Sequence, residues 1–249
     1  MIEAVIFELG AALIQLDALD ALAYGQVAAA LRPELVAAEV TACCAELLGL
    51  SRYELAQQLL QQFDLQPAAQ MRSSELVVAT GWQSLLHLQA RAYERLLSAP
   101  ATIDAVAWQH HVALLYTARS MGCRIALVAD TANGLVRQIL QTLNLADSFD
   151  LVLTREDVDE GLANPELYLT VARELEVEPA ACLTVCRSPQ GVRAALSAGT
   201  VVLAAAPAPL RRAFTPFASH CRCVIVSQLT TLPGHLHAQI ASREPDERE

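Results

Sequence analysis

The sequence predicts an α/β protein, in which a Rossmann-like parallel sheet is flanked by helices and carries an inserted all-helical cap domain. Short apolar runs alternate with helical patterns over residues 1–16 and 99–240, which predicts the sheet domain. Residues 17–98 contain helical patterns alone, which predicts the cap. The 249 residues are 54% hydrophobic and 18% charged, so apolar side chains suffice for a large core.

Six short apolar segments are the expected strands. They are Val5–Leu9, Arg124–Val128, Leu151–Leu153, Cys182–Cys186, Val201–Ala204 and Val224–Val226. Helices are expected between the later strands, at 104–121, 131–143, 165–176 and 189–199. Pro165 and Pro189 suit a first helical turn, and Gly122 and Gly199 suit a helix end. This alternation implies right-handed crossovers and a ligand site at the carboxyl ends of the strands.

The cap, residues 17–98, is predicted as a series of amphipathic helices. A helix follows Pro33, a capping box at Ser51 and Glu54 starts another, and Ser73 opens a run to Leu97. Residues 241–249 are polar and expected to be disordered. Some apolar side chains of the cap either form its own core or offer a surface to a partner, namely Trp82, Leu85, Leu86 and Leu88.

Charge and cysteine content narrow the function classes. The net charge is −10 and all 17 basic residues are arginine, without a basic run, so we expect no nucleic acid ligand. No apolar stretch reaches the roughly 18–20 residues of a membrane span, and the N-terminus does not resemble a signal peptide. Seven cysteines without secretory context indicate reduced thiols and a cytoplasmic protein. The close pairs Cys221–Cys223 and His235–His237 are not spaced like a zinc module.

Several segments carry a resemblance to a known family. They are Val5-Ile-Phe7 before an acid, Ala146-Asp-Ser-Phe-Asp150, Asn164-Pro-Glu-Leu-Tyr168 and Ser188-Pro-Gln-Gly-Val-Arg-Ala-Ala-Leu-Ser-Ala-Gly199. In this order the chain resembles the haloacid dehalogenase-like hydrolases with a helical cap, from residue 1 to about 236. The resemblance implies an aspartate nucleophile and, two residues later, an acid that protonates the leaving group. It also implies a Ser or Thr and a Lys that hold the phosphoryl group, and further aspartates that bind magnesium.

All four of these motifs are altered in this chain. Glu8 stands for the nucleophile, Gly10 for the acid, Ala129-Asp130 for the hydroxyl motif, Leu162 for the lysine and Arg187 for a magnesium ligand. A carboxylate misplaced by about 1 Å can cost ~100-fold in rate, and a lost general acid roughly 100- to 10,000-fold. A guanidinium has donors only and cannot bind a metal ion. We therefore expect no catalytic residues, no metal site and no cofactor, with magnesium binding lost.

A vestigial cleft is expected where the strands end. Glu8 and Arg187 follow neighbouring strands in this fold, so we expect their side chains to form an ion pair in place of magnesium, with Asp130 nearby. Asp130 also suits a helix N-cap before Thr131, and Ser188 suits one before Pro189. The expected binding residues are Glu8, Asp130, Arg187 and Ser188.

The altered motifs predict a catalytically inactive family member that binds another protein or a second copy of itself, as a subunit, scaffold or regulator. One alternative is a hydrolase or phosphatase with altered chemistry. Its available reagents are Glu8, Asp130, Thr131, Ser188, His110 and His111. A second alternative is a small-molecule sensor using the cap–core cleft, where Ser188 at a helix N-terminus suits an anion.

Overall fold

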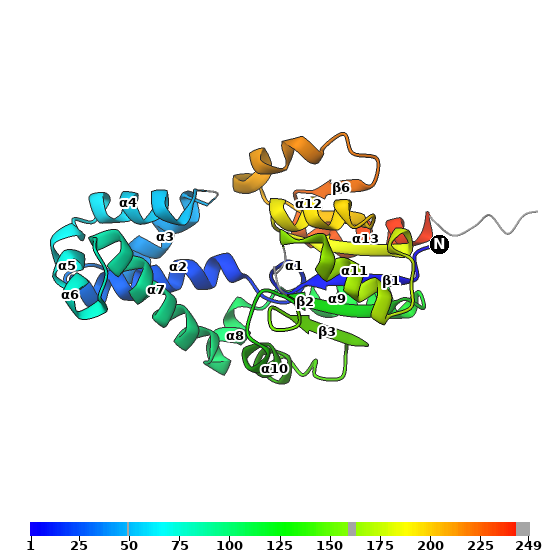
Figure 1. Ribbon diagram of the computed structural model, residues 1–249, viewed down its shortest axis with the longest axis horizontal. Helices are drawn as coiled ribbons and strands as arrows, with labels where there is room; N and C mark the ends of the chain where they lie inside the picture. Colours follow the sequence, from blue (N-terminus) through cyan, green and yellow to red (C-terminus); the bar gives the residue numbers. More distant parts are fainter. Residues whose placement is uncertain (49, 159–162, 243–249) are drawn as a thin grey trace, which may run out of the picture. The chain divides into compact units, whose positions relative to one another are not determined.

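A six-stranded parallel sheet forms the centre of one of two units in the computed structural model, which describes residues 1–48, 50–158 and 163–242 (Figure 1). This sheet unit takes in Met1–Ile14 and the chain from Ala107 onward. The strand order is β3-β2-β1-β4-β5-β6. The strands are β1 Ala4–Glu8, β2 Arg124–Ala129, β3 Leu151–Thr154, β4 Cys182–Cys186, β5 Val201–Ala205 and β6 Cys223–Val226. The predicted fold class is confirmed.

Helices of the sheet unit follow its strands in the order expected of parallel crossovers. The α-helices are α1 Leu9–Ala12, α9 His111–Ser120, α10 Asn133–Thr142, α11 Pro165–Glu174, α12 Pro189–Ser197 and α13 Leu232–Ala241. Short 3-10 segments are η2 Pro179–Ala181, η3 Ala208–Phe217 and η4 Leu229–Thr231. Figure 1 labels these elements.

Apolar side chains on both faces bury the central strands. All five residues of β1 are buried, as expected of a parallel strand covered on both sides. Ile6 and Val128 share one buried cluster with Tyr168 of α11 and Val192 of α12. Because side chains alternate along a strand, Val5 and Phe7 point to the opposite face. The face of the sheet that carries Ile6 and Val128 is therefore packed against α11 and α12.

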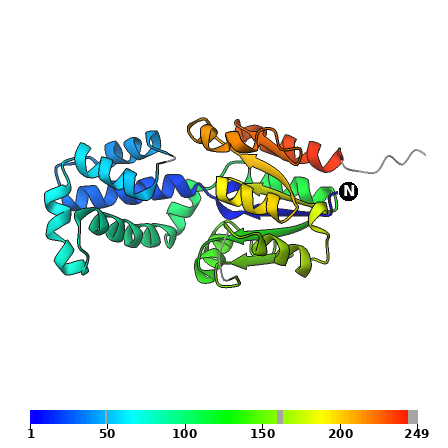
Figure 2. The ribbon, with the colours of Figure 1, turned by 45° about the horizontal axis from the view of Figure 1, so that its top comes forward.

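The second unit, Gln15–Val106, consists of helices. They are α2 Leu16–Leu31, α3 Ala37–Glu46, α4 Arg52–Gln62, α5 Gln66–Met71, α6 Ser73–Leu76, α7 Gly81–Leu97 and α8 Pro100–Val106. Figure 2 shows this helical unit in blue to green, with α2 packed against α3 and α7. Leu85 is buried, and Trp82, Leu86 and Leu88 pack against the core of this unit. These side chains thus belong to the core of the helical unit.

A polar chain crosses the otherwise apolar interior of the helical unit. The side-chain amide of Gln89, which is 1% exposed, donates to Asp20 at 2.5 Å. The guanidinium of Arg52 in turn donates to the Gln89 carbonyl oxygen at 3.0 Å. Burial raises the Asp20 pKa, and Arg52 and Gln89 oppose that rise. The chain links α2, α7 and α4 through side chains.

Several predicted boundaries differ from the structure. The expected helix 104–121 is interrupted between α8 and α9, where Trp108 N–H donates to the Leu13 carbonyl at 2.8 Å. The expected run from Ser73 to Leu97 is divided by a capping box at Thr80. The cap was expected over 17–98, and the helical unit spans Gln15–Val106. Of the expected tail, residue 241 ends α13, and 243–249 lie outside the described residues.

The helices that the structure describes include no candidate membrane span. None of them combines the length and the apolar character that a bilayer span requires.

Candidate functional site

The candidate site lies at the carboxyl ends of the three central strands. Glu8 ends β1 and pairs in register with Val128 of β2, while Phe7 pairs with Val185 of β4. Arg187 follows the last residue of β4 directly. The strand pattern therefore brings Glu8 and Arg187 together, as predicted for the edge where parallel α/β sheets bind ligands.

The Glu8 carboxylate is 3% exposed and hydrogen-bonded on both oxygens. The Tyr168 hydroxyl donates to Oε1 at 2.9 Å, and the backbone N–H of Arg187 donates to Oε2 at 3.0 Å. The Cys186 thiol and the Ser188 backbone N–H lie close enough to this carboxylate to favour its ionised form. Burial raises the pKa of Glu8, and these four groups oppose the rise. Glu8 is thus a buried acid whose proton is held more tightly than usual.

A glycine makes room for this carboxylate at the start of α12. A Cβ placed on Gly191 would lie 1.9 Å from Oε1 of Glu8, which no side chain at position 191 allows while Glu8 stays in place. Ser188 caps the same helix, with its hydroxyl accepting from Gly191 N–H at 2.9 Å. The carboxylate therefore lies against a helix N-terminus, where backbone dipoles favour negative charge.

The guanidinium of Arg187 lies over an indole ring. Its Cζ is 5.1 Å from the centroid of Trp108, a cation–π distance. The contact with Glu8 runs through the Arg187 backbone N–H. The predicted Glu8–Arg187 side-chain ion pair is not among the ion pairs within 4.0 Å that the described residues form. Arg187 is half-buried, and its guanidinium lies at the strand ends beside the Trp108 ring.

Trp108 and His110 secure the turn after β1. Trp108 Nε1–H donates to the Gly10 carbonyl at 3.0 Å, and His110 lies near the Ala11 backbone. Their rings stack with centroids 5.3 Å apart at 24°. Burial lowers the pKa of His110, and the charges of His111 and Arg187 act in the same direction. The sequence reasoning missed Trp108, although an indole beside two histidines was the available signal.

The remaining predicted site residues have varied surroundings. Ala129 is buried at the end of β2, and Asp130 is exposed. Asp130 does not cap a helix, because α10 begins at Asn133 with Ala132 as its N-cap. Thr131 is 9% exposed. Leu162 lies outside the described residues.

The donor set at this site does not fit magnesium. Gly10 has no side chain, and Arg187 brings only N–H donors, which cannot bind a metal ion. Within residues 1–48, 50–158 and 163–242, no group of three or more His, Cys, Asp or Glu residues is arranged to hold a metal ion.

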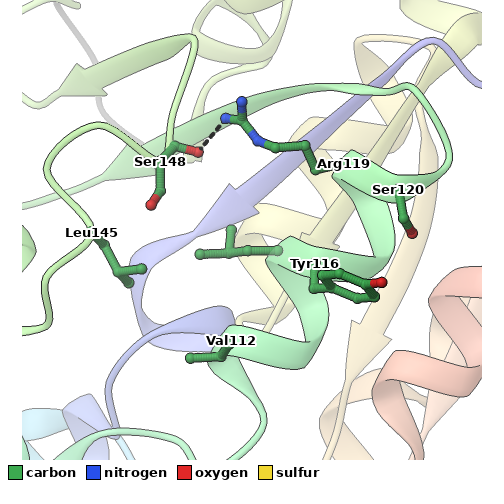
Figure 3. Close-up of a pocket in the computed structure, with 7 residues that line it drawn as sticks. Val112, Tyr116, Arg119, Ser120, Leu145 and Ser148 are labelled. Atoms are coloured by element: carbon green, nitrogen blue, oxygen red, sulfur yellow. Dashed lines mark hydrogen bonds between the residues drawn. The ribbon is translucent and has the colours of Figure 1, made fainter.

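A groove elsewhere on the sheet unit lies along α9. Figure 3 shows Val112, Tyr116, Arg119 and Ser120 on this helix, with Val112 and Arg119 pointing toward the segment that carries Leu145 and Ser148. Its volume is about 390 Å³, and Arg119 donates to the Ser148 carbonyl at 2.8 Å. Arg119 and Ser148 precede β2 and β3, so this end of the groove is near the starts of those strands. The groove is thus distinct from the strand-end site.

Comparison with known proteins identifies relatives over most of the chain. The haloacid dehalogenase-like hydrolase family matches residues 17–199. The chain is 28% identical to validoxylamine A 7'-phosphate phosphatase of Streptomyces hygroscopicus subsp. limoneus over 144 residues, which are 57% of this chain and 65% of the relative. It is also 28% identical to beta-phosphoglucomutase of Bacillus subtilis over 117 residues, 47% of this chain and 50% of the relative.

A solved structure agrees with the fold. The HAD family hydrolase of Deinococcus radiodurans R1, with bound phosphate and sodium, superimposes with a TM-score of 0.66 at 19% identity. The match covers 96% of each chain. This chain spans between 17% and 65% of the length of the curated relatives it matches. The family resemblance predicted from the sequence is confirmed.

The predicted function needs correction. The sequence analysis expected a catalytically inactive protein that acts by binding, because all four motifs are altered. The matched relatives are named a phosphatase and a phosphoglucomutase, which favours the alternative prediction of a hydrolase with altered chemistry. The error came from judging the site only by the groups that one mechanism requires.

Proposed function

Because the chain belongs to the haloacid dehalogenase-like hydrolase family, we propose that it hydrolyses phosphate monoesters by chemistry that its own altered residues supply. The observation that carries this proposal is the placement of a buried carboxylate, Glu8, and the cation Arg187 at the ends of adjacent strands, where the backbone N–H of Arg187 donates to Glu8. Substrates in this class join a phosphate group to a small alcohol.

Arg187 is assigned to the phosphate group. A guanidinium presents paired N–H donors that match phosphate oxygens, and it keeps its charge at all working pH values. The Trp108 ring beneath the guanidinium restricts its orientation, which reduces the entropy lost when an anion binds. Arg187 thus takes over the charge neutralisation for which the family uses magnesium and lysine.

Glu8 is assigned to proton transfer. Its raised pKa suits a group that takes and returns a proton, because burial makes the protonated form easier to reach than in an exposed carboxyl group. The carboxylate accepts a proton from the attacking water as the new P–O bond forms. The ester P–O bond breaks, and the protonated Glu8 returns that proton to the departing alkoxide. The products are an alcohol and inorganic phosphate.

The same proposal covers cofactor, substrate size and location. We propose that turnover needs no magnesium, given the donor set described above. A net charge of −10 favours small esters over nucleic acid. All seven cysteines are free, which suits a reducing, cytoplasmic location. The partner protein expected from the sequence belonged to the binding role corrected above and forms no part of this proposal.

Turnover of a panel of phosphate monoesters tests this function. Purified protein is assayed for phosphate release with EDTA and with magnesium, beside Glu8→Gln and Arg187→Met. We expect turnover in EDTA, a loss of about 100-fold or more in kcat for Glu8→Gln, and a raised KM for Arg187→Met.

Matched controls are Glu3→Gln and Arg193→Met, which change exposed residues of the same types. Both should behave as the wild type. Absence of turnover in the wild type under both conditions would refute the function, and turnover that EDTA abolishes would refute the magnesium-free chemistry.

A further inference from the structure

Two residues outside the family's four altered motif positions surround Oε1 of Glu8. We infer that Tyr168 and Gly191 are positioning residues, which together fix the carboxylate of Glu8 for the proton transfer proposed above. The inference rests on the proposed function for its catalytic meaning. Its geometric content, that these two residues determine where the carboxylate lies, stands on contacts in the structure alone.

Tyr168 is a rigid donor. Its ring is fully buried in the cluster that contains Ile6 and Val128, so packing fixes the direction of its hydroxyl. The start of α11 is fixed as well, because the Asn164 side chain caps the helix by accepting from Glu166 N–H at 2.8 Å. A carboxylate only accepts hydrogen bonds, so the Tyr168 hydroxyl is the donor of the hydrogen bond to Oε1.

Gly191 supplies the space that the longer side chain of Glu8 requires. The position of its missing Cβ lies 1.9 Å from Oε1 and 3.0 Å from Cδ of Glu8. It also lies 2.8 Å from the Ser188 hydroxyl, so the first turn of α12 has no room to accommodate a methyl group by a small shift. A side chain at 191 therefore displaces the carboxylate from the position in which it accepts from the Tyr168 hydroxyl.

The position of the Glu8 carboxylate must be fixed by its surroundings, because the side chain has three rotatable torsions and a reacting group needs a defined position. A misplacement of about 1 Å can cost ~100-fold in rate. The titratable and charged groups around the carboxylate are Tyr168 from α11, Cys186 from β4 and Arg187 after β4. Among the side chains, Tyr168 gives the larger opposition to the burial-raised pKa of Glu8.

The decisive measurement is a carboxyl ¹³C NMR titration of Glu8 in wild type, Tyr168→Phe and Tyr116→Phe, with Glu8→Gln to assign the signal. Tyr168→Phe removes one oxygen and keeps the packed ring, so it is expected to fold. We expect a higher Glu8 pKa in this variant, because the opposing donor is gone. Tyr116→Phe, the same change on a tyrosine that is 73% exposed, should leave the Glu8 titration unchanged.

Kinetics provide the second readout. For Tyr168→Phe we expect kcat/KM to fall by about tenfold at acidic pH, with the acidic limb of its pH profile moved to higher pH. Gly191→Ala should lower kcat more than it changes KM, and its matched control Gly234→Ala, where a Cβ meets nothing within 4 Å, should not.

The outcomes separate the two proposals. A Glu8 pKa that is equal or lower in Tyr168→Phe refutes the positioning role, even when the wild type is active. An inactive wild type refutes the proposed function, while the titration still decides where Tyr168 acts. A Gly191→Ala protein that does not fold leaves the Tyr168 measurements to decide the inference.

Discussion

Two carboxylates, the buried Glu8 in the sheet unit and the half-buried Asp20 in the helical unit, are held by different means. Glu8 in the sheet unit accepts from the Tyr168 hydroxyl and from backbone N–H groups, which are neutral donors. Asp20 in the helical unit accepts from Gln89, which is bonded in turn to the cation of Arg52. Burial raises the pKa of both acids.

The difference separates a reactive acid from a structural one. Neutral donors stabilise the ionised form of Glu8 less strongly than a nearby cation would. The carboxyl group can therefore gain and lose a proton without moving. At Asp20 the attraction of Arg52 favours the ionised form, and the hydrogen-bonded chain ties three helices together. A raised pKa alone does not tell a catalytic acid from a structural one. The hydrogen-bond and charge partners of the acid make that distinction.

The largest expected effect is in the helical unit, on replacing Gln89. Gln89→Leu keeps the side-chain volume but leaves Asp20 without its amide donor in the interior, which should lower the free energy of unfolding by about 1–3 kcal/mol. Urea denaturation measures this. Gln57→Leu, an exposed change on α4, should cost much less. Equal losses of stability in the two variants would show that the hydrogen bonds of Gln89 have no structural role.

An intermediate effect should appear in the pH dependence of stability. The folded-state pKa of Glu8 lies above its ordinary value of 4.5, so the native state binds the proton more tightly than the unfolded state. Wild-type stability should therefore fall as pH rises from 4.5 through the folded pKa. Glu8→Gln cannot ionise, so its stability relative to wild type should increase over this range.

Asp20→Asn sharpens the same test. The stability of this variant relative to wild type should also increase as pH rises above the ordinary Asp value of 3.8, but less steeply, because Asp20 is half-buried and keeps more of its hydration than the buried Glu8. A stronger pH dependence for Asp20→Asn than for Glu8→Gln would reverse the comparison.

The smallest effect is expected on replacing Arg52, which is exposed. Arg52→Met removes a solvent-screened charge and one hydrogen bond, so it should cost under ~1 kcal/mol in chemical denaturation. A loss as large as that of Gln89→Leu would place the stabilisation in the cation and not in the amide.

The sequence predicted the sheet and the edge where the site lies, because apolar runs and strand order suffice for both. Glu8 and Arg187 could be placed at adjacent strand ends for this reason. The direction of the Arg187 side chain could not be predicted, because it depends on Trp108, 79 positions away in a segment whose apolar pattern looks helical. Backbone pairing with Leu13 interrupts that helix.

The surroundings of Glu8 also escaped prediction. The substitution by glutamate was interpreted as a displaced carboxylate, but its final position depends on the hydroxyl of Tyr168 and on an absent Cβ at Gly191. Neither contact can be predicted from the periodicity of apolar residues in the sequence. The functional prediction failed for a related reason, since a count of groups missing from one mechanism does not describe what the remaining groups can do.

The indole beneath Arg187 has a practical consequence. The protein has two tryptophans, and each unit holds one: Trp108 in the sheet unit, and Trp82 against Tyr53 in the helical unit. Each unit therefore contains a single tryptophan, whose emission can be excited selectively. An anion that draws the guanidinium off Trp108 will change the emission of that ring, so substrate capture can be followed optically without any label.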